Sequence, residues 1–224
     1  MIEAVVFDMD GLLVQSDPLW LRNRRALVEE YGAPWTESDE LELAGVDTSV
    51  WVDSIHRRIG GRLAPERVRE EVLRRMAGSY AGGEIIVLPG AHEALAGCSR
   101  VYRTGLASGS PRFLIDAALA ATGWASHFEN ILSSEDVTRG KPAPDVYLEI
   151  LRRMGVSPAR SVVVEDSSGG IRAGKAAGAR VVAVPNPHTL PPPEVLAMAD
   201  ARIDSLHALG PALDAWNREP MEDP

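Results

Sequence analysis

A short apolar run near the N-terminus ends in two aspartates, and this feature most strongly limits what the chain can fold into. Residues 5–11 read VVFDMDG, so Asp8 and Asp10 are separated by one residue. In an extended strand, residues i and i+2 point to the same face, about 6.5 Å apart along the strand. The two carboxylates would repel each other unless they bound a divalent cation such as Mg²⁺, or served as a nucleophile beside a proton donor.

Apolar runs predict buried strands at residues 4–7, 101–107, 162–164 and 181–184. Helical patterns lie between the later runs, at residues 111–121, 144–154 and 171–177. This alternation predicts βαβ units and a mostly parallel sheet with helices on both faces. In such folds, ligands bind outside the carboxyl ends of the strands.

Residues 17–84 have no strong strand run but carry amphipathic helical patterns at residues 19–31, 49–59 and 65–80. We interpret residues 17–84 as a helical cap domain and residues 1–16 and 85–224 as the core. The predicted fold class is α/β, a Rossmann-like parallel sheet core with a small helical cap domain inserted after the first strand. We expect the cap to open and close over the sheet edge.

The bulk composition excludes several classes of function. The 224 residues carry a formal net charge of −9, whereas nucleic-acid binding needs a basic surface. A phosphorylated substrate would be repelled at long range, so its attraction must be local. With one cysteine, Cys98, and no signal-peptide or bilayer-spanning pattern, we expect a cytoplasmic protein with no membrane partner. Oligomeric state is not predicted.

A second acidic motif follows a predicted strand, because residues 162–170 read VVVEDSSGG. An acidic helix start would explain Glu165 and Asp166 taken alone. Parallel strands share a carboxyl edge, however, so these acids and Asp8 and Asp10 are expected to converge. Unpaired, four carboxylates would raise each other's pKa values. A bound Mg²⁺ would remove that problem.

Two further motifs suit a phosphate group. Residues 106–111 read LASGSP, in which Ser108 ends a strand and Gly109 precedes a helix start. A hydroxyl and the backbone N–H groups at a helix N-terminus can bind a phosphate oxygen, while Ser110 fits an ordinary N-cap. Residues 140–145 read GKPAPD. Most surface lysines are merely solvated, but the prolines after Lys141 give it a rigid frame and hence a fixed target.

The order of these motifs resembles that of the haloacid dehalogenase-like hydrolase superfamily, specifically its β-phosphoglucomutase-like branch of sugar-phosphate phosphatases and mutases. The matching segments are residues 8–14 with Ser16, 107–111, 140–145, and 165–167 with Gly170 and Gly178. The resemblance implies a hydrolase acting on a small phosphorylated metabolite, with a sugar phosphate as the default substrate.

The same resemblance implies a role for each matching residue. Asp8 would be the nucleophile that takes the phosphoryl group, and Asp10 the acid and then the base. Ser108, Gly109 and Lys141 would bind the phosphoryl oxygens of the substrate. Mg²⁺ would bind the Asp8 side chain, the Asp10 carbonyl and Asp166, with Glu165 as a further ligand.

The chain departs from the branch at three places. Gln15 replaces the usual Asp, Trp20 stands where the mutases carry a histidine, and the turn at residues 45–48 lacks the arginine that mutases use to grip a second phosphate. A mutase must exclude water, whereas a phosphatase must admit it. Gln15 lies past the chemistry and should leave the reaction intact, but the missing histidine and arginine favour an aspartyl-phosphate phosphatase, with a β-phosphoglucomutase-type phosphomutase as the alternative.

Two other classes are less favoured. Dehalogenases of the superfamily lack the second acid, and a catalytically silent binding protein would have lost a key acid or the lysine, whereas this chain keeps them all. The arginines at positions 22, 24 and 25 fall on one predicted helix. We expect them to lie on a solvated helix face.

Overall fold

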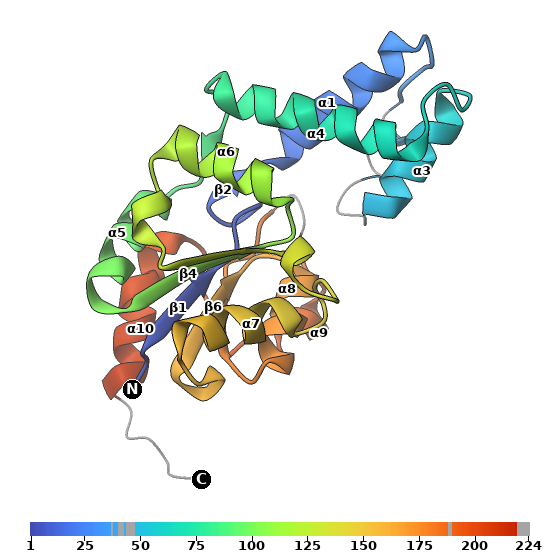
Figure 1. The fold of residues 1–224 in the computed structure, drawn as a ribbon. Helices are drawn as coiled ribbons and strands as arrows, with labels where there is room; N and C mark the ends of the chain where they lie inside the picture. Colours follow the sequence, from blue (N-terminus) through green and yellow to red (C-terminus); the bar gives the residue numbers. More distant parts are fainter. Residues whose placement is uncertain (37, 40–42, 44–47, 188–189, 219–224) are drawn as a thin grey trace. The chain divides into compact units, whose positions relative to one another are not determined.

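The computed structural model describes residues 1–36, 38–39, 43, 48–187 and 190–218 (Figure 1). The chain divides into two compact units. Unit 1 comprises Met1–Gln15 and Ile86–Pro224, and unit 2 comprises Ser16–Ile85. The role of unit 2 as a cap stays a prediction.

Unit 1 is built on a six-stranded sheet of order β5-β4-β1-β6-β7-β8, with every pairing parallel. Its strands are β1 (Ala4–Phe7), β4 (Arg103–Ser108), β5 (Asn130–Ser133), β6 (Ser161–Glu165), β7 (Arg180–Ala183) and β8 (Ala201–Arg202). Phe7 of β1 lies opposite Leu106 of β4 and Val164 of β6. The residues that follow these three therefore come together at one carboxyl edge.

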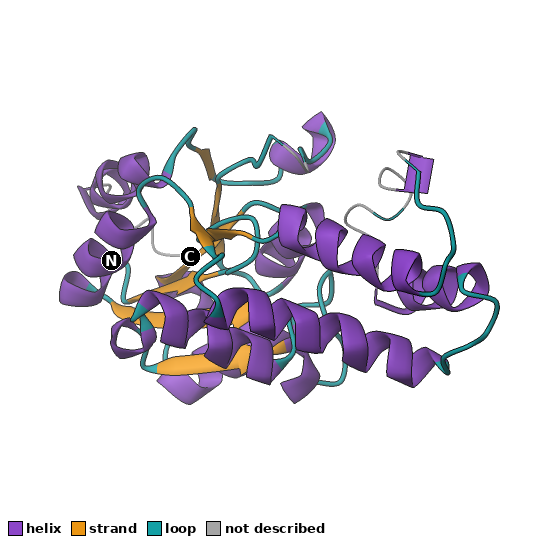
Figure 2. Ribbon diagram, turned by 90° about the horizontal axis from the view of Figure 1, so that it is seen from above, coloured by secondary structure: helices purple, strands orange, loops and turns teal. Residues whose placement is uncertain are grey.

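Helices cover both faces of this sheet, as Figures 1 and 2 show. They are α5 (Ala91–Val101), α6 (Arg112–Thr122), α7 (Asp145–Met154), α8 (Ser168–Ala176), α9 (Pro193–Leu196) and α10 (Leu209–Arg218). On one face, Tyr147 and Ile150 of α7 and Ile171 of α8 share a core with Val6 and Val163. The opposite face carries α5, α6 and α10. The strands are apolar on both faces for this reason, and the predicted α/β fold class is confirmed.

The sequence prediction lacked the helices α5 and α10, which cover one face of the sheet, and the strands at its margins. The strand predicted at residues 101–107 starts at Arg103, because Val101 still belongs to α5. β5 and β8 are the two edge strands, and the NILS sequence of β5 has only two fully buried residues. An edge strand has one neighbour instead of two, so it needs no long apolar run. A separate antiparallel pair joins β2 (Val14–Gln15) to β3 (Ile86–Val87).

Unit 2 contains the three predicted helices, α1 (Asp17–Glu30), α3 (Thr48–Arg58) and α4 (Pro65–Ala81). Its core includes Leu27, Trp51, Ile55 and Val68. The turn at residues 45–48, which the mutase comparison used, falls almost wholly outside the described residues. Among the residues that the structure describes, no helix has the length and apolar character needed to cross a bilayer.

The prediction that the first arginines of unit 2 lie on a solvated face is wrong for Arg24. Its side chain is buried, with the guanidinium 5.1 Å from the Trp20 ring and 4.9 Å from the Trp51 ring. It donates to the Leu43 carbonyl at 2.8 Å. Burial lowers the pKa of Arg24 to about 10, although the charge of Asp17 opposes this. Arg24 is thus part of the packing of unit 2.

Candidate active site

The carboxyl edge of the sheet in unit 1 brings together three of the predicted acids. Asp8 follows β1, while Glu165 ends β6 and Asp166 follows it. Each offers one carboxylate oxygen, and these oxygens lie within 4.8 Å of one another. All three residues are buried. We call this set the acidic group.

Lys141 joins the acidic group from the loop before α7. Its Nζ lies 2.5 Å from Asp8 Oδ1 and 2.6 Å from Glu165 Oε1, and donates to the Ala107 carbonyl at 3.0 Å. An ammonium has three hydrogens, so all of its donors have a partner. The charges of Asp8 and Glu165 outweigh burial and hold the pKa of Lys141 well above its usual value. The lysine is a fixed cation, as its rigid frame predicted.

Both oxygens of Glu165 already have protein donors. Oε1 accepts from Lys141 and from the Tyr147 hydroxyl at 2.7 Å, and Oε2 accepts from Ser167 Oγ at 2.9 Å and from two backbone N–H groups. Burial pushes the pKa of Glu165 up, but Lys141 and these donors outweigh it and lower the pKa. A Cβ at Gly170 would overlap this carboxylate, so glycine is required at that position. Glu165 is an ionised anchor.

Asp8 and Asp166 have raised pKa values, in contrast to Glu165. Burial raises the pKa of Asp8 to about 8 against the attraction of Lys141, and Glu165 and Asp10 add to the rise. Burial, Glu165 and Asp8 also raise the pKa of Asp166 well above its usual value. Asp166 Oδ1 is buried without a hydrogen-bond partner. Three carboxylates with one ammonium and an orphaned oxygen fit a hard divalent cation such as Mg²⁺.

These pKa shifts predict how the stability of the metal-free protein depends on pH. Asp8 and Asp166 bind protons more tightly in the folded protein than in the unfolded chain, so the free energy of unfolding should fall as pH rises. The fall should continue up to about pH 8, the pKa of Asp8, with a slope of at most about 1.4 kcal/mol per pH unit for each proton. Urea unfolding in EDTA between about pH 5 and pH 8 measures it.

Added Mg²⁺ provides the control for this measurement. A bound cation favours the ionised carboxylates, so Mg²⁺ should stabilise the protein most at the high end of the pH range. A free energy of unfolding that rises with pH in EDTA would contradict the raised pKa values of Asp8 and Asp166.

Asp10 is held apart from the acidic group. Its Oδ2 accepts from Ser110 Oγ at 2.8 Å and from Ser108 Oγ at 3.1 Å, and its Oδ1 is buried without a hydrogen-bond partner. The Asp10 side chain is not among the three clustered acids, in keeping with a predicted metal contact through its carbonyl alone. The four predicted carboxylates thus divide into a cluster of three and one separate acid beside two hydroxyls.

In the loop after β4, Ser110 is not the helix N-cap that the sequence suggested. The N-cap residue of α6 is Pro111, and no side chain caps this helix. Ser110 instead turns its hydroxyl to Asp10, while its backbone N–H donates to Ser108 Oγ at 3.0 Å. Gly109 between them is exposed, with open space where a Cβ would lie. A phosphoryl oxygen could approach the loop there.

Sequence reasoning gave no role in the site to several residues that shape it. Tyr147 binds Glu165 from the first turn of α7, and Ser167 both binds Glu165 and caps α8 by accepting from Gly170 N at 3.0 Å. Ser110 was seen only as a cap. Ser167 carried a usable signal, since a serine between a strand end and a glycine pair is a typical N-cap. Tyr147 carried none, because helix periodicity marks it simply as core.

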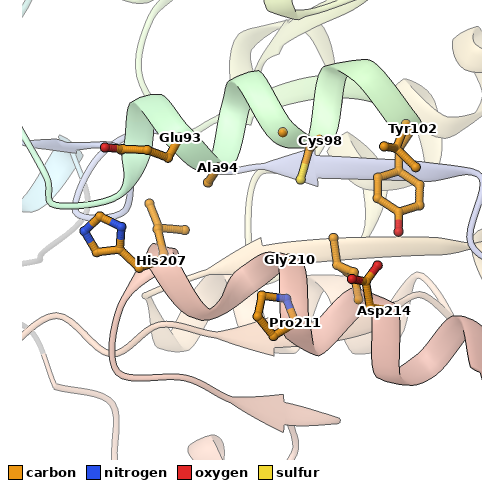
Figure 3. Close-up of a pocket in the computed structure, with 12 residues that line it drawn as sticks. Glu93, Ala94, Cys98, Tyr102, His207, Gly210, Pro211 and Asp214 are labelled. Atoms are coloured by element: carbon orange, nitrogen blue, oxygen red, sulfur yellow. The ribbon is translucent and has the colours of Figure 1, made fainter.

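A separate hollow of about 300 Å³ lies between α5 and α10 (Figure 3). Figure 3 shows Glu93 and His207 toward one end of the hollow and Tyr102 and Asp214 toward the other. None of the predicted site residues lines it. The chemistry-bearing residues therefore gather elsewhere, at the carboxyl edge of the sheet.

Known proteins match nearly the whole chain. A family model described as haloacid dehalogenase-like hydrolase matches residues 2–178. Hexitol phosphatase B of Escherichia coli is 34% identical over 93% of this chain and 94% of its own length. The phosphorylated carbohydrates phosphatase of Thermotoga maritima is 31% identical over 79% of this chain and 82% of its own length.

A solved structure adds a match in three dimensions. The crystal structure of CbbY from Rhodobacter sphaeroides in complex with phosphate has a TM-score of 0.82 and 30% sequence identity, and the match covers 94% of this chain and 97% of that one. The predicted enzyme class, a phosphoric monoester hydrolase, is confirmed at the level of the family. The chain belongs to the haloacid dehalogenase-like hydrolase family.

Proposed function

We propose that the protein is a Mg²⁺-dependent phosphatase that hydrolyses a small phosphomonoester through an aspartyl-phosphate on Asp8. One observation carries the proposal. Asp8 lies against Lys141 in the acidic group, whereas Asp10, two residues along the chain, lies beside Ser108 and Ser110. The two acids therefore occupy the different surroundings that a nucleophile and a proton donor need.

The residues that would hold Mg²⁺ are Asp8 and Asp166 through their side chains and Asp10 through its carbonyl, with Glu165 beside them. The fit rests on the three clustered carboxylates and on the orphaned Asp166 Oδ1. When bound, the cation offsets negative charge, so that a carboxylate can approach an anionic phosphate. Glu165 has protein donors on both oxygens, which suits it to holding Lys141 in place.

The chain's own residues account for both steps. An Asp8 oxygen attacks phosphorus, the bond to the ester oxygen breaks, and Asp10 gives its proton to the leaving alcohol. Asp10 then takes a proton from the water that attacks phosphorus, which releases inorganic phosphate and frees Asp8. The positive charge of Lys141, the Ser108 hydroxyl and the loop at Gly109 stabilise the charge on the equatorial oxygens. Ser108 Oγ contacts Asp10, so a phosphoryl oxygen would compete with Asp10 for this donor.

A sugar phosphate or the phosphate of a related polyol is the proposed substrate class. Support comes from the names of the relatives, hexitol phosphatase and phosphorylated carbohydrates phosphatase. Hydrolysis is favoured over phosphoryl transfer between two positions of a sugar. Trp20 offers no acid–base group where the mutases carry a histidine. The centroids of the Trp20 and Trp51 rings lie 6.1 Å apart, so Trp20 packs against Trp51.

Phosphate release from p-nitrophenyl phosphate tests the proposal, followed by a panel of hexose, hexitol and pentose phosphates. We expect turnover with Mg²⁺ and none with EDTA, because the acidic group would then keep its uncompensated charge. Turnover that persists after complete chelation would contradict the metal requirement. Conversion of a sugar 1-phosphate into the 6-phosphate without free phosphate would favour the mutase alternative.

A further inference from the structure

Asn186 lies buried at the carboxyl edge of unit 1, in the loop that follows β7, and it belongs to none of the motifs. The residue is only 4% exposed. The amide Nδ2 donates to the Gly11 carbonyl at 3.3 Å and to Gln15 Oε1 at 3.0 Å. Gly11 lies between β1 and β2, and Gln15 ends β2. One side chain from a distant loop thus holds the segment that begins with Asp8 and Asp10.

The segment that Asn186 holds, which begins with Asp8 and Asp10, would present metal ligands. Gly11 N donates to the Val14 carbonyl at 2.8 Å, and the Gly11 carbonyl accepts from Asn186. Gly11 has a φ of +83°, and a Cβ there would overlap Asp166 Oδ2 and lie 3.2 Å from Asn186 Nδ2. Residue 11 therefore lies between the Asp166 carboxylate and the Asn186 amide. A shift of Gly11 would move the Asp10 carbonyl relative to Asp166.

We propose that Asn186 is a positioning residue for the metal site, with Gln15 orienting its amide. The inference rests on the proposed function. Asn186 binds the peptide unit next to the Asp10 carbonyl, and such outer contacts commonly change metal affinity 10–100-fold. Gln15 is a neutral acceptor, so the acidic group gains no additional buried negative charge nearby. The side-chain amides of Asn186 and Gln15 are thus joined by a hydrogen bond.

Mg²⁺ binding measured by isothermal titration calorimetry tests this role without any substrate. For Asn186→Ala, we expect the Mg²⁺ dissociation constant to rise about tenfold over that of the unaltered protein. Asn186→Leu, which leaves less of a cavity and also removes the donor, should give the same rise if the alanine variant does not fold. Hydrolysis of p-nitrophenyl phosphate should fall at limiting Mg²⁺ and recover at a correspondingly higher concentration, with the KM for the ester nearly unchanged. A purely structural defect would not recover with Mg²⁺.

Asn217→Ala is the matched control, because Asn217 also bridges two chain segments through its amide. It accepts from Ile2 N at 2.9 Å and donates to Tyr102 Oη at 2.9 Å, away from the acidic group. This variant should lower the melting temperature but leave the Mg²⁺ dissociation constant unchanged. An unchanged constant in both Asn186 variants, with an active Mg²⁺-dependent parent, would overturn the role of Asn186 alone. A parent that binds no Mg²⁺ would overturn both the proposed function and this inference.

Discussion

Replacement of Asp8 by asparagine is expected to lower the kcat for p-nitrophenyl phosphate by about 10⁴-fold or more, because an amide oxygen cannot serve as the attacking carboxylate. The fold should survive the change. An asparagine Oδ1 can still accept from Lys141 Nζ, which lies 2.5 Å from Asp8 Oδ1. The substitution also removes a buried carboxyl group whose ionisation is disfavoured, since the pKa of Asp8 is raised to about 8. The melting temperature at about pH 8 should therefore equal or exceed that of the parent.

Steady-state kinetics with thermal unfolding on the same samples measures both effects. Asp116→Asn is the control, because Asp116 is an exposed acid paired with Arg112 on α6 and should leave kcat unchanged. Substantial turnover by the Asp8 variant, with a metal-dependent parent, would refute Asp8 as the nucleophile. A folded, inactive Asp8 variant beside an active Asp116 variant is the expected result.

Replacement of Lys141 by methionine is expected to cost both activity and stability. It removes the ammonium that lies 2.5 Å from Asp8 Oδ1 and 2.6 Å from Glu165 Oε1, while the buried carboxylates remain. Leaving a buried charge without its partner costs about 3 kcal/mol. Loss of a charge-stabilising donor should lower kcat by about 10³-fold. Urea unfolding and phosphate release measure the two losses separately.

The pH dependence of this stability loss distinguishes its electrostatic cause from poor packing. Without the ammonium, the folded-state pKa of Glu165 should rise, and that of Asp8, already raised, should rise further above its value in the unfolded chain. The variant then binds more protons when folded, so its stability deficit should shrink as the pH falls from about 8 to about 5. Lys175→Met, which removes a surface partner of Asp200, should cost under about 1 kcal/mol. A deficit independent of pH would point to packing.

The sequence alone predicted the sheet core and the acids at its edge. β1, β6 and β7 are continuous apolar runs because neighbours cover both of their faces, and that pattern is local. The i, i+2 spacing of Asp8 and Asp10 and the position of Glu165 at a strand end are likewise local. Parallel pairing then requires acids on neighbouring strands to meet. The edge strand β5 was missed, and the start of β4 was misplaced, because no such pattern marks them.

Only tertiary contacts decided the separate role of each of these residues. The sequence predicted four converging carboxylates with raised pKa values, yet Lys141 and Tyr147 lower the pKa of Glu165, while Ser108 and Ser110 hold Asp10 apart. Asn186 lies 175 positions along the chain from Gly11. A partner so distant leaves no trace in local periodicity. Sequence thus determined which groups arrive at the edge, and folding determined which of them pair, because pairing depends on distances and burial that only the packed chain defines.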